Sequence, residues 1–390
     1  MATTITAGNA TNGAAISSDN TGILELKSGT GSGTTAMTVG TGQAVTFAQA
    51  ANLPNTFGFK NRIINGAMVI DQRNAGASVT PNNAYTLDRW QLENAQTGKV
   101  SIQQNAGSVT PPAGFVNYLG VTSLSAYSVL TADYFLLTHI IEGLNTGDLA
   151  WGTANAQAVT ISFWVRSSLT GTFGAAVNNN AQNRTYPFTY TISSANTWEQ
   201  KTVTIPGDTS GTWLTTNGIG IRLRFNLGTG ATYSGTAGAW TGTSNVFAPT
   251  GATSVVGTNG ATFYITGVQL EKGSTATSFD YRDYGRELML CQRYCQKNQA
   301  ASGRAGSATE GAFYVPLVPV MRAAPTMSLL TGTNMIDQIY TANRTVSAVA
   351  TVFGNNEAGS SVSITLTTSG MTTGAQLALF GGCVILSAEL

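Results

Sequence analysis

Charged side chains are scarce in this sequence of 390 residues. Asp, Glu, Lys and Arg together make up 9% of it, whereas a soluble globular domain usually contains roughly 25%. The 19 basic and 18 acidic residues nearly cancel, and no cluster of Lys and Arg is available to displace counterions from a phosphate backbone. We therefore expect no nucleic acid among the partners. Hydrophobic residues still make up 42% of the chain, enough to fill a core, which excludes an acidic disordered chain.

Cysteine and histidine are too few to support several kinds of site. The three cysteines, Cys291, Cys295 and Cys383, form an odd number, so we expect free thiols rather than a disulfide framework. The one histidine, His139, lies in the apolar run YFLLTHII, which indicates a buried structural imidazole. These residues are too few for a tetrahedral zinc site. We predict no metal and no cofactor.

Long apolar runs are also lacking, and we expect no leader. No stretch approaches the ~18 apolar residues that cross a bilayer, so we expect no membrane insertion. The opening residues, MATTITAGNATNG, contain neither a basic nor an apolar signal region, so no secretory signal peptide is predicted. We expect a protein made in a cytoplasm.

Residues that favour strands and turns dominate what remains. Thr, Ser, Asn, Gln and Gly supply an uncharged polar surface, and the Thr/Gly/Val-rich composition predicts an all-β fold. Residues 1–58 are low in complexity, with short β signals in GILELKSG and AMTVGTGQAVTFAQ. Neither segment can bury a core alone. We predict an arm of short strands there, completed by other chains.

Residues 59–281 show the alternation of a β-sandwich. In VTISFWVRSS, every second residue from Ile161 to Val165 is apolar, and IGIRLRF repeats the pattern from Ile219 to Phe225. TYPFTYTI, EQKTVTIPG and ATFYITGVQLEKG supply further strands between turns rich in Gly, Asn and Ser. About eight strands in such a region predict a jelly roll of two antiparallel sheets packed face to face.

A short helix is predicted at residues 282–298, where charge density rises. Tyr284, Leu288, Cys291 and Cys295 are spaced 4, 3 and 4 residues apart, like a heptad seam. Because so short a helix is unstable alone, we expect three copies to bury this seam in a homotrimer. For residues 299–390, the pattern predicts a distal β domain of six short strands.

The alternation also indicates a candidate ligand surface. Trp164 and Arg166 share the side of their strand that faces away from the core, and so do Arg222 and Arg224. If the two strands are neighbours, these four side chains form an aromatic and cationic face suited to a sugar ring and its hydroxyls. The alternative is a structural cation–π contact at an interface or under a loop.

No catalytic constellation is recognisable. The acidic residues Asp280, Asp283 and Glu287 alternate with Arg282 and Arg286, which is typical of ion pairs along a helix. A glycosidase needs two carboxylates across a cleft, and no such pair is recognisable in the sequence. Neither a G-x-S-x-G elbow nor a phosphate-binding P-loop occurs. We predict no catalytic residue.

Three long stretches resemble a known group of proteins. They are KNRIINGAMVIDQRNAG with YTLDRW, TWEQKTVTIPGDTSGTW, and VQLEKGSTATSFDYRDYGRELMLCQRYCQK. This combination resembles tail-fibre and related receptor-binding proteins of tailed bacteriophages, those with a carbohydrate-binding-module-like jelly roll. The likeness covers about residues 59–300. MRAAPT and the closing SAEL resemble the distal domain of such fibres, and GILELKSG…VTFAQ resembles their virion-proximal segments.

The resemblance implies a homotrimeric, non-enzymatic tail component of a virion that binds host surface polysaccharide. Residues 1–58 would then contact other tail or baseplate proteins. The matching motifs look structural, and no ligand-binding residue carries over from the group. Two other functions stay open: a depolymerase or esterase that acts on surface polysaccharide, and a head-decoration fibre built from the same modules.

Overall fold

The computed structural model describes residues 24–28, 34–39, 45–47, 60–298, 301–329, 333–337, 342–353, 361–381 and 384–390. The chain divides into two compact units, Met1–Thr56 and Phe57–Leu390. Strands make up nearly all of the regular structure, as predicted. Among the described residues, one α-helix occurs besides four single 3-10 turns, and no helix is long and apolar enough to span a membrane.

The first unit contains a small antiparallel sheet of three strands in the order β1-β2-β3. These are β1 (Leu24–Ser28), β2 (Thr34–Val39) and β3 (Val45–Phe47). β1 and β3 fall within the two segments of residues 1–58 for which strands were predicted, and β2 begins two residues before the second of these segments. Completion of this arm by other chains stays a prediction.

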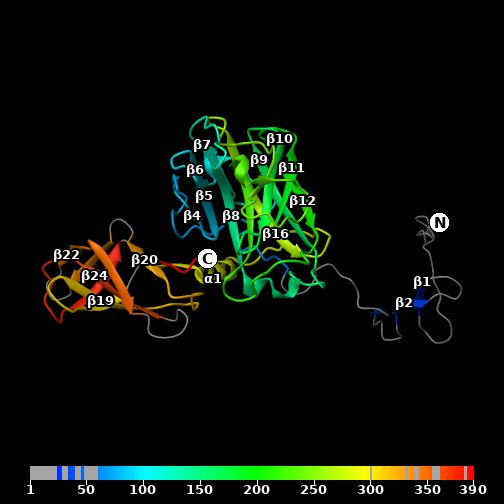
Figure 1. Ribbon diagram of the computed structural model, residues 1–390. Helices are drawn as coiled ribbons and strands as arrows, with labels where there is room; N and C mark the ends of the chain where they lie inside the picture. Colours follow the sequence, from blue (N-terminus) through cyan, green and yellow to red (C-terminus); the bar gives the residue numbers. More distant parts are fainter. Residues whose placement is uncertain are drawn as a thin grey trace, which may run out of the picture. The chain divides into compact units, whose positions relative to one another are not determined.

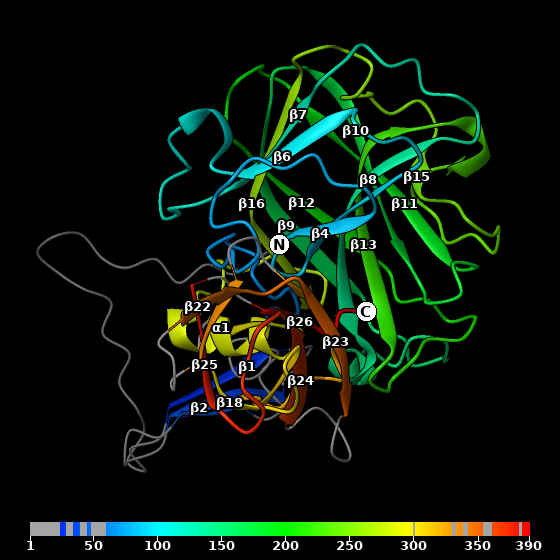
Figure 2. The ribbon, with the colours of Figure 1, turned by 90° about the vertical axis from the view of Figure 1, so that its left-hand side faces the viewer.

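Two antiparallel sheets form the predicted β-sandwich (Figures 1 and 2). The six-stranded sheet has the order β11-β10-β13-β8-β5-β4, built from β4 (Ala84–Leu87), β5 (Trp90–Asn94), β8 (Tyr134–Glu142), β10 (Gly171–Asn178), β11 (Thr185–Ile192) and β13 (Ile219–Thr229). The five-stranded sheet has the order β12-β9-β16-β7-β6, built from β6 (Val100–Gln104), β7 (Leu119–Ser123), β9 (Val159–Ser167), β12 (Glu199–Ile205) and β16 (Thr262–Lys272).

The core lies between these sheets and follows the predicted alternation. Ile161 and Phe163 of β9 and Leu223 and Phe225 of β13 are fully buried, and the rings of Phe163 and Phe225 meet edge to face at 5.1 Å. Burial of apolar side chains from both sheets is the main force that holds them together. The predicted jelly-roll sandwich is confirmed.

A long connection covers part of the outer face of the six-stranded sheet. It joins β13 to β16 and carries the short strands β14 (Ser234–Gly235) and β15 (Ala248–Pro249). Pro249 packs so closely on Gly174 of β10 that a Cβ there would lie 2.4 Å from the proline ring. A glycine is therefore required at position 174, and the connection stays pressed onto the sheet.

The linking helix is shorter than predicted. Helix α1 spans Tyr284–Gln292, with the Asp283 side chain accepting a hydrogen bond from the Arg286 backbone N–H at its start. The chain then turns, and Cys295 begins strand β17 (Cys295–Asn298). The predicted seam of Tyr284, Leu288, Cys291 and Cys295 therefore does not lie on one helix face.

The two cysteines of the predicted seam are also buried within the chain. Cys291 and Cys295 are fully buried as free thiols, and Cys291 packs with Ile64, Ile70 and Tyr294. Tyr284, by contrast, is 64% exposed. The four residues therefore do not form one apolar helical seam, because Cys295 lies in β17 and both cysteines are already buried within the chain. The trimer itself stays a prediction. Cys383 lies outside the described residues.

The distal region has its own core and two sheets. One has the order β22-β21-β25-β18-β19-β24-β23, and the other β17-β26-β20. Their remaining strands are β18 (Ala301–Ala305), β19 (Glu310–Pro316), β20 (Thr326–Leu329), β21 (Thr333–Asp337), β22 (Ala342–Thr345), β23 (Ala348–Phe353), β24 (Ser361–Thr367), β25 (Gln376–Gly381) and β26 (Val384–Ser387). All six predicted strands are present, whereas β17, β18, β21 and β22 were not predicted.

The first stretch that carried the resemblance, KNRIINGAMVIDQRNAG with YTLDRW, contains a network of buried hydrogen bonds. Asn65 bonds the backbone carbonyls of Ile70 and Asp88 through its side-chain amide, and its own carbonyl accepts the indole N–H of Trp90. His139 is fully buried, as predicted, and its Nε2 lies 3.0 Å from the carbonyl oxygen of Ile64. These bonds tie the first motif stretch to β5 and β8 of the six-stranded sheet.

Candidate functional site

The four residues predicted to form one ligand surface lie on opposite faces of the sandwich. Trp164 and Arg166 belong to β9 in the five-stranded sheet, whereas Arg222 and Arg224 belong to β13 in the six-stranded sheet. Since the two strands are not neighbours, the expected joint face does not form. Each pair must therefore be considered separately.

The pair on β9 makes structural contacts. The Arg166 Nε–H donates to the carbonyl of Asn196 at 3.0 Å, and its guanidinium lies 5.5 Å from the ring centre of Tyr264. Trp164 is half-buried and packs against Gly267. This arrangement fits the structural alternative, a cation–π contact.

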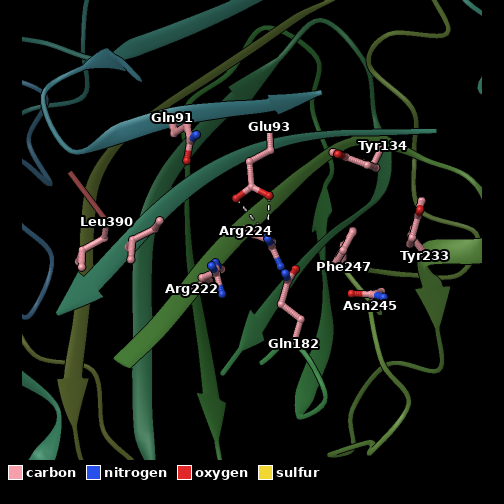
Figure 3. A pocket seen from close by; sticks show the side chains of 11 residues that line it. Gln91, Glu93, Tyr134, Gln182, Arg222, Arg224, Tyr233, Asn245, Phe247 and Leu390 are labelled. Atoms are coloured by element: carbon pink, nitrogen blue, oxygen red, sulfur yellow. Dashed lines mark hydrogen bonds and ion pairs between the residues drawn. The ribbon is translucent and has the colours of Figure 1, made fainter. Parts of the chain in front are cut away.

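The pair on β13 lines a groove of about 410 Å³ on the outer face of the six-stranded sheet. The β13–β16 connection borders it on one side and β5 on the other. Figure 3 shows the lining side chains, which are Gln91, Glu93, Tyr134, Ile140, Gln182, Arg222, Arg224, Tyr233, Asn245, Phe247 and Leu390. Aromatic rings and hydrogen-bonding groups together are typical of a small-molecule or sugar site.

Strand register places the polar groups over the sheet. Gln91 of β5, Thr138 of β8 and Arg224 of β13 stand opposite one another across three neighbouring strands. Thr138 is fully buried, so the long side chains on either side close over it. One row further along, Ile140 stands opposite Arg222.

The ion pair between Arg224 and Glu93 is the fixed element of the groove (Figure 3). Arg224 Nη2 donates to Glu93 Oε2 at 2.7 Å, Nε lies 3.4 Å from Oε1, and Nη1 donates to Asn178 Oδ1 at 3.2 Å. The guanidinium also lies 4.4 Å from the ring centre of Phe247. Because Arg224 is only 2% exposed, these partners hold it in one geometry.

Three aromatic rings form a wall beside this ion pair. The rings of Tyr233 and Phe247 stack at 5.0 Å, and Tyr134 meets both edge to face at 5.4 and 5.6 Å. Burial raises the pKa of Tyr134, so its hydroxyl stays protonated at neutral pH. The wall combines ring surface with hydroxyl groups that can donate or accept hydrogen bonds.

A second group of aromatic residues packs together and forms hydrogen bonds within the protein. Trp151, Trp213 and Trp240 meet edge to face at 4.6 to 5.6 Å. Each indole N–H already has an acceptor: the carbonyl of Gln157, the carboxylate of Asp208 and the carbonyl of Pro206. Because the three indoles pack edge to face on one another and their N–H groups are all occupied, this cluster is a weaker candidate for a ligand site than the groove.

Sequence reasoning found Arg222 and Arg224 but missed their companions. Alternation in WQLEN does place Glu93 on the outer face of β5. Nothing local, however, shows that this carboxylate lies beside an arginine 131 positions later. Tyr233 and Phe247 come from an irregular connection and carry no periodic signal.

The described parts of the chain contain no group of three or more His, Cys, Asp or Glu side chains that could hold a metal ion. No family model and no curated protein matches the sequence.

Several solved structures are similar to this chain at low identity. A putative sugar-binding protein from Bacteroides thetaiotaomicron is 12% identical over 55% of this chain and 100% of its own, with a TM-score of 0.32. A family 4 carbohydrate-binding module is 13% identical over 54% and 99%, with a TM-score of 0.29. The enzymatically active domain of bacteriophage CBA120 tailspike protein 4 is 12% identical over 54% of this chain, with a TM-score of 0.30, and this chain covers only 21% of it. These similarities are too weak to assign a function.

Proposed function

We propose that this protein binds a glycan in the groove of the six-stranded sheet. The observation that carries the proposal is the fixed Arg224–Glu93 pair set against the wall of Tyr134, Tyr233 and Phe247. Aromatic rings pack against the apolar C–H faces of sugars, while held polar groups exchange hydrogen bonds with sugar hydroxyls. Such hydrogen bonds contribute about 0.5–1.5 kcal/mol each, so a single site of this kind binds weakly.

Binding without hydrolysis fits the groove better than catalysis does. Glycosidases use two carboxylates, one as acid and one as base or nucleophile. Glu93 is the one carboxylate side chain among the described residues that line the groove, and Arg224 holds it on both oxygens. We therefore propose a non-enzymatic role. Incubation with surface polysaccharide should release no new reducing ends, and their appearance would support the depolymerase alternative.

The finer part of the proposal is that the chain is a tail-fibre subunit of a tailed phage virion and acts as a homotrimer. It rests on the three motif stretches described above and on the strands within residues 1–58. A trimer would present three grooves, and linked sites raise avidity by roughly 10²–10⁴ where geometry permits joint binding. Electron microscopy of virions labelled with antibody against this chain would separate tail from head attachment.

Two substitutions test the location of the site. Tyr233→Ala removes a half-buried ring of the wall, and we expect it to lower glycan retention in affinity electrophoresis about tenfold. Trp164→Ala removes a half-buried ring from the opposite sheet and should leave retention unchanged. The reverse result, with both variants folded, would place the site on the five-stranded sheet.

A further inference from the structure

Arg222 and Arg224 point outward from the same strand, yet only one of them has a carboxylate partner. In Arg224, the edge of the guanidinium formed by Nε and Nη2 faces the two oxygens of Glu93. This edge presents two parallel N–H groups that match a carboxylate. In the groove, the Nε–Nη2 edge of Arg224 is therefore already occupied by the Glu93 carboxylate.

The same edge of Arg222 is open. Its Nη1 donates to the carbonyl of Asn180 at 2.8 Å and lies 3.4 Å from that of Asn179, which fixes the side chain. Among the described residues, its Nε and Nη2 have no hydrogen-bond partner, and Arg222 forms no ion pair. Neither atom is sealed from solvent. Figure 3 shows the guanidinium of Arg222 beside the Arg224–Glu93 pair.

The charge around Arg222 is unbalanced as well. Among the side chains that line the groove, two guanidiniums accompany one carboxylate, which Arg224 holds, and no described carboxylate forms an ion pair with Arg222. Burial, followed by the charge of Arg224, lowers the pKa of Arg222, with Glu93 opposing them in part. A partly buried cation held beside a second cation is costly unless an anion joins it.

We propose that Arg222 binds an oxyanion substituent of the glycan, so that the ligand is an acidic polysaccharide rather than a neutral one. This inference rests on the proposed function and names the class of its ligand. A carboxylate would take the open Nε–Nη2 edge as Glu93 takes that of Arg224, while the uncharged part of the sugar packs along the aromatic wall. A sulfate or phosphate ester offers the same pair of acceptor oxygens, so the experiment must separate these sources.

To test this, the protein is first applied to an array of acidic and neutral polysaccharides of bacterial surfaces. Its affinity for polygalacturonate, dextran sulfate and unmodified dextran is then measured by titration. We expect binding on the array to be confined to acidic glycans and to weaken with added salt. Stronger binding of polygalacturonate than of dextran sulfate identifies a carboxylate, and the opposite order identifies a sulfate or phosphate ester. Binding of neutral glycans with equal affinity overturns the acidic-ligand inference but supports the proposed function. Binding of no glycan at all overturns both.

Variants of Arg222 sharpen the result. Arg222→Gln should weaken binding of the acidic polymer about tenfold or more, while thermal melts confirm that it folds. Arg222→Lys keeps the charge but lacks the paired N–H edge, so it should recover only part of the affinity. Arg286→Gln removes the same charge from an exposed position on α1 and should change nothing. Equal losses for the variants at 222 and 286 would show a net-charge effect and overturn the role of Arg222.

Discussion

Replacement of Glu389 by glutamine should destabilise the protein strongly, although this residue lies outside the groove. Its carboxylate accepts hydrogen bonds from Arg73 at 2.9 Å and from Arg89. Glu389 and Arg89 have side-chain exposures of only 6% and 1%. Arg89 also lies 3.6 Å from the ring centre of Tyr294 and donates to the carbonyl of Ile140. One carboxylate thus neutralises two guanidiniums at the joint between the sandwich and strand β26.

The magnitude follows from what Glu389→Gln leaves behind. Burial by itself lowers the pKa of Arg89, but Glu389, Tyr294, Tyr85 and Cys291 together outweigh it and raise the pKa. Because an arginine is not deprotonated in proteins, Arg89 stays charged in the variant as well. Without the carboxylate, Arg89 and Arg73 are like charges in a buried place. Removal of one partner of a buried ion pair typically costs about 3–5 kcal/mol. The glutamine oxygen still accepts one hydrogen bond, so we expect a loss of ~3 kcal/mol.

Urea unfolding at pH 7 measures this free energy directly, and differential scanning fluorimetry should show Tm lower by roughly 5–10 °C. The matched control is Glu310→Gln, the same change at an exposed position of β19. In a double-mutant cycle, Arg73→Gln should recover part of the loss, because it removes one of the two uncompensated charges. A cost for Glu389→Gln within about 0.5 kcal/mol of the control would refute the reasoning.

Four further outcomes are expected. Burial raises the pKa of Asp88 to about 6, against the opposing effects of Arg73 and Gln72. The stability contributed by its protonated form is complete below the ordinary pKa of 3.8 and is lost as pH rises through about 6. In urea unfolding, Asp88→Asn should therefore gain roughly 1–3 kcal/mol relative to the wild type between pH 4 and 7, and a pH-independent difference would contradict this. Cys291 and Cys295 are fully buried, and burial raises the pKa of each thiol. A disulfide reagent should therefore label neither in the native protein but should find three thiols per chain after denaturation without reductant, and a count of one would disprove free thiols. Trp151→Ala should cost about 3–5 kcal/mol in urea unfolding, because it opens a cavity among packed rings; a cost below 1 kcal/mol would show that the cluster collapses to fill the space. Sedimentation equilibrium should give three times the chain mass of 40.4 kDa, and the mass of a single chain would refute the trimer.

The sequence by itself determined the properties that depend on neighbouring residues. Alternation along a strand assigns side chains to two faces, because successive residues of a strand point in opposite directions. That rule placed Phe163 and Leu223 in the core and turned Arg222 and Arg224 outward, as the structure confirms. Composition likewise determined the all-β class and the uncharged polar surface.

Tertiary structure alone decided which strands became neighbours. In the order β11-β10-β13-β8-β5-β4, the neighbours β10-β13, β13-β8 and β8-β5 come from distant parts of the chain. Their pairing follows from burial of the whole core rather than from any local preference. For this reason Trp164 and Arg222, so alike by pattern, lie on opposite sheets, while Glu93 and Arg224 meet. A contact between distant segments also decides where α1 ends. Cys295, which the spacing of apolar residues placed on the helix, lies instead in β17, because β17 pairs with β26.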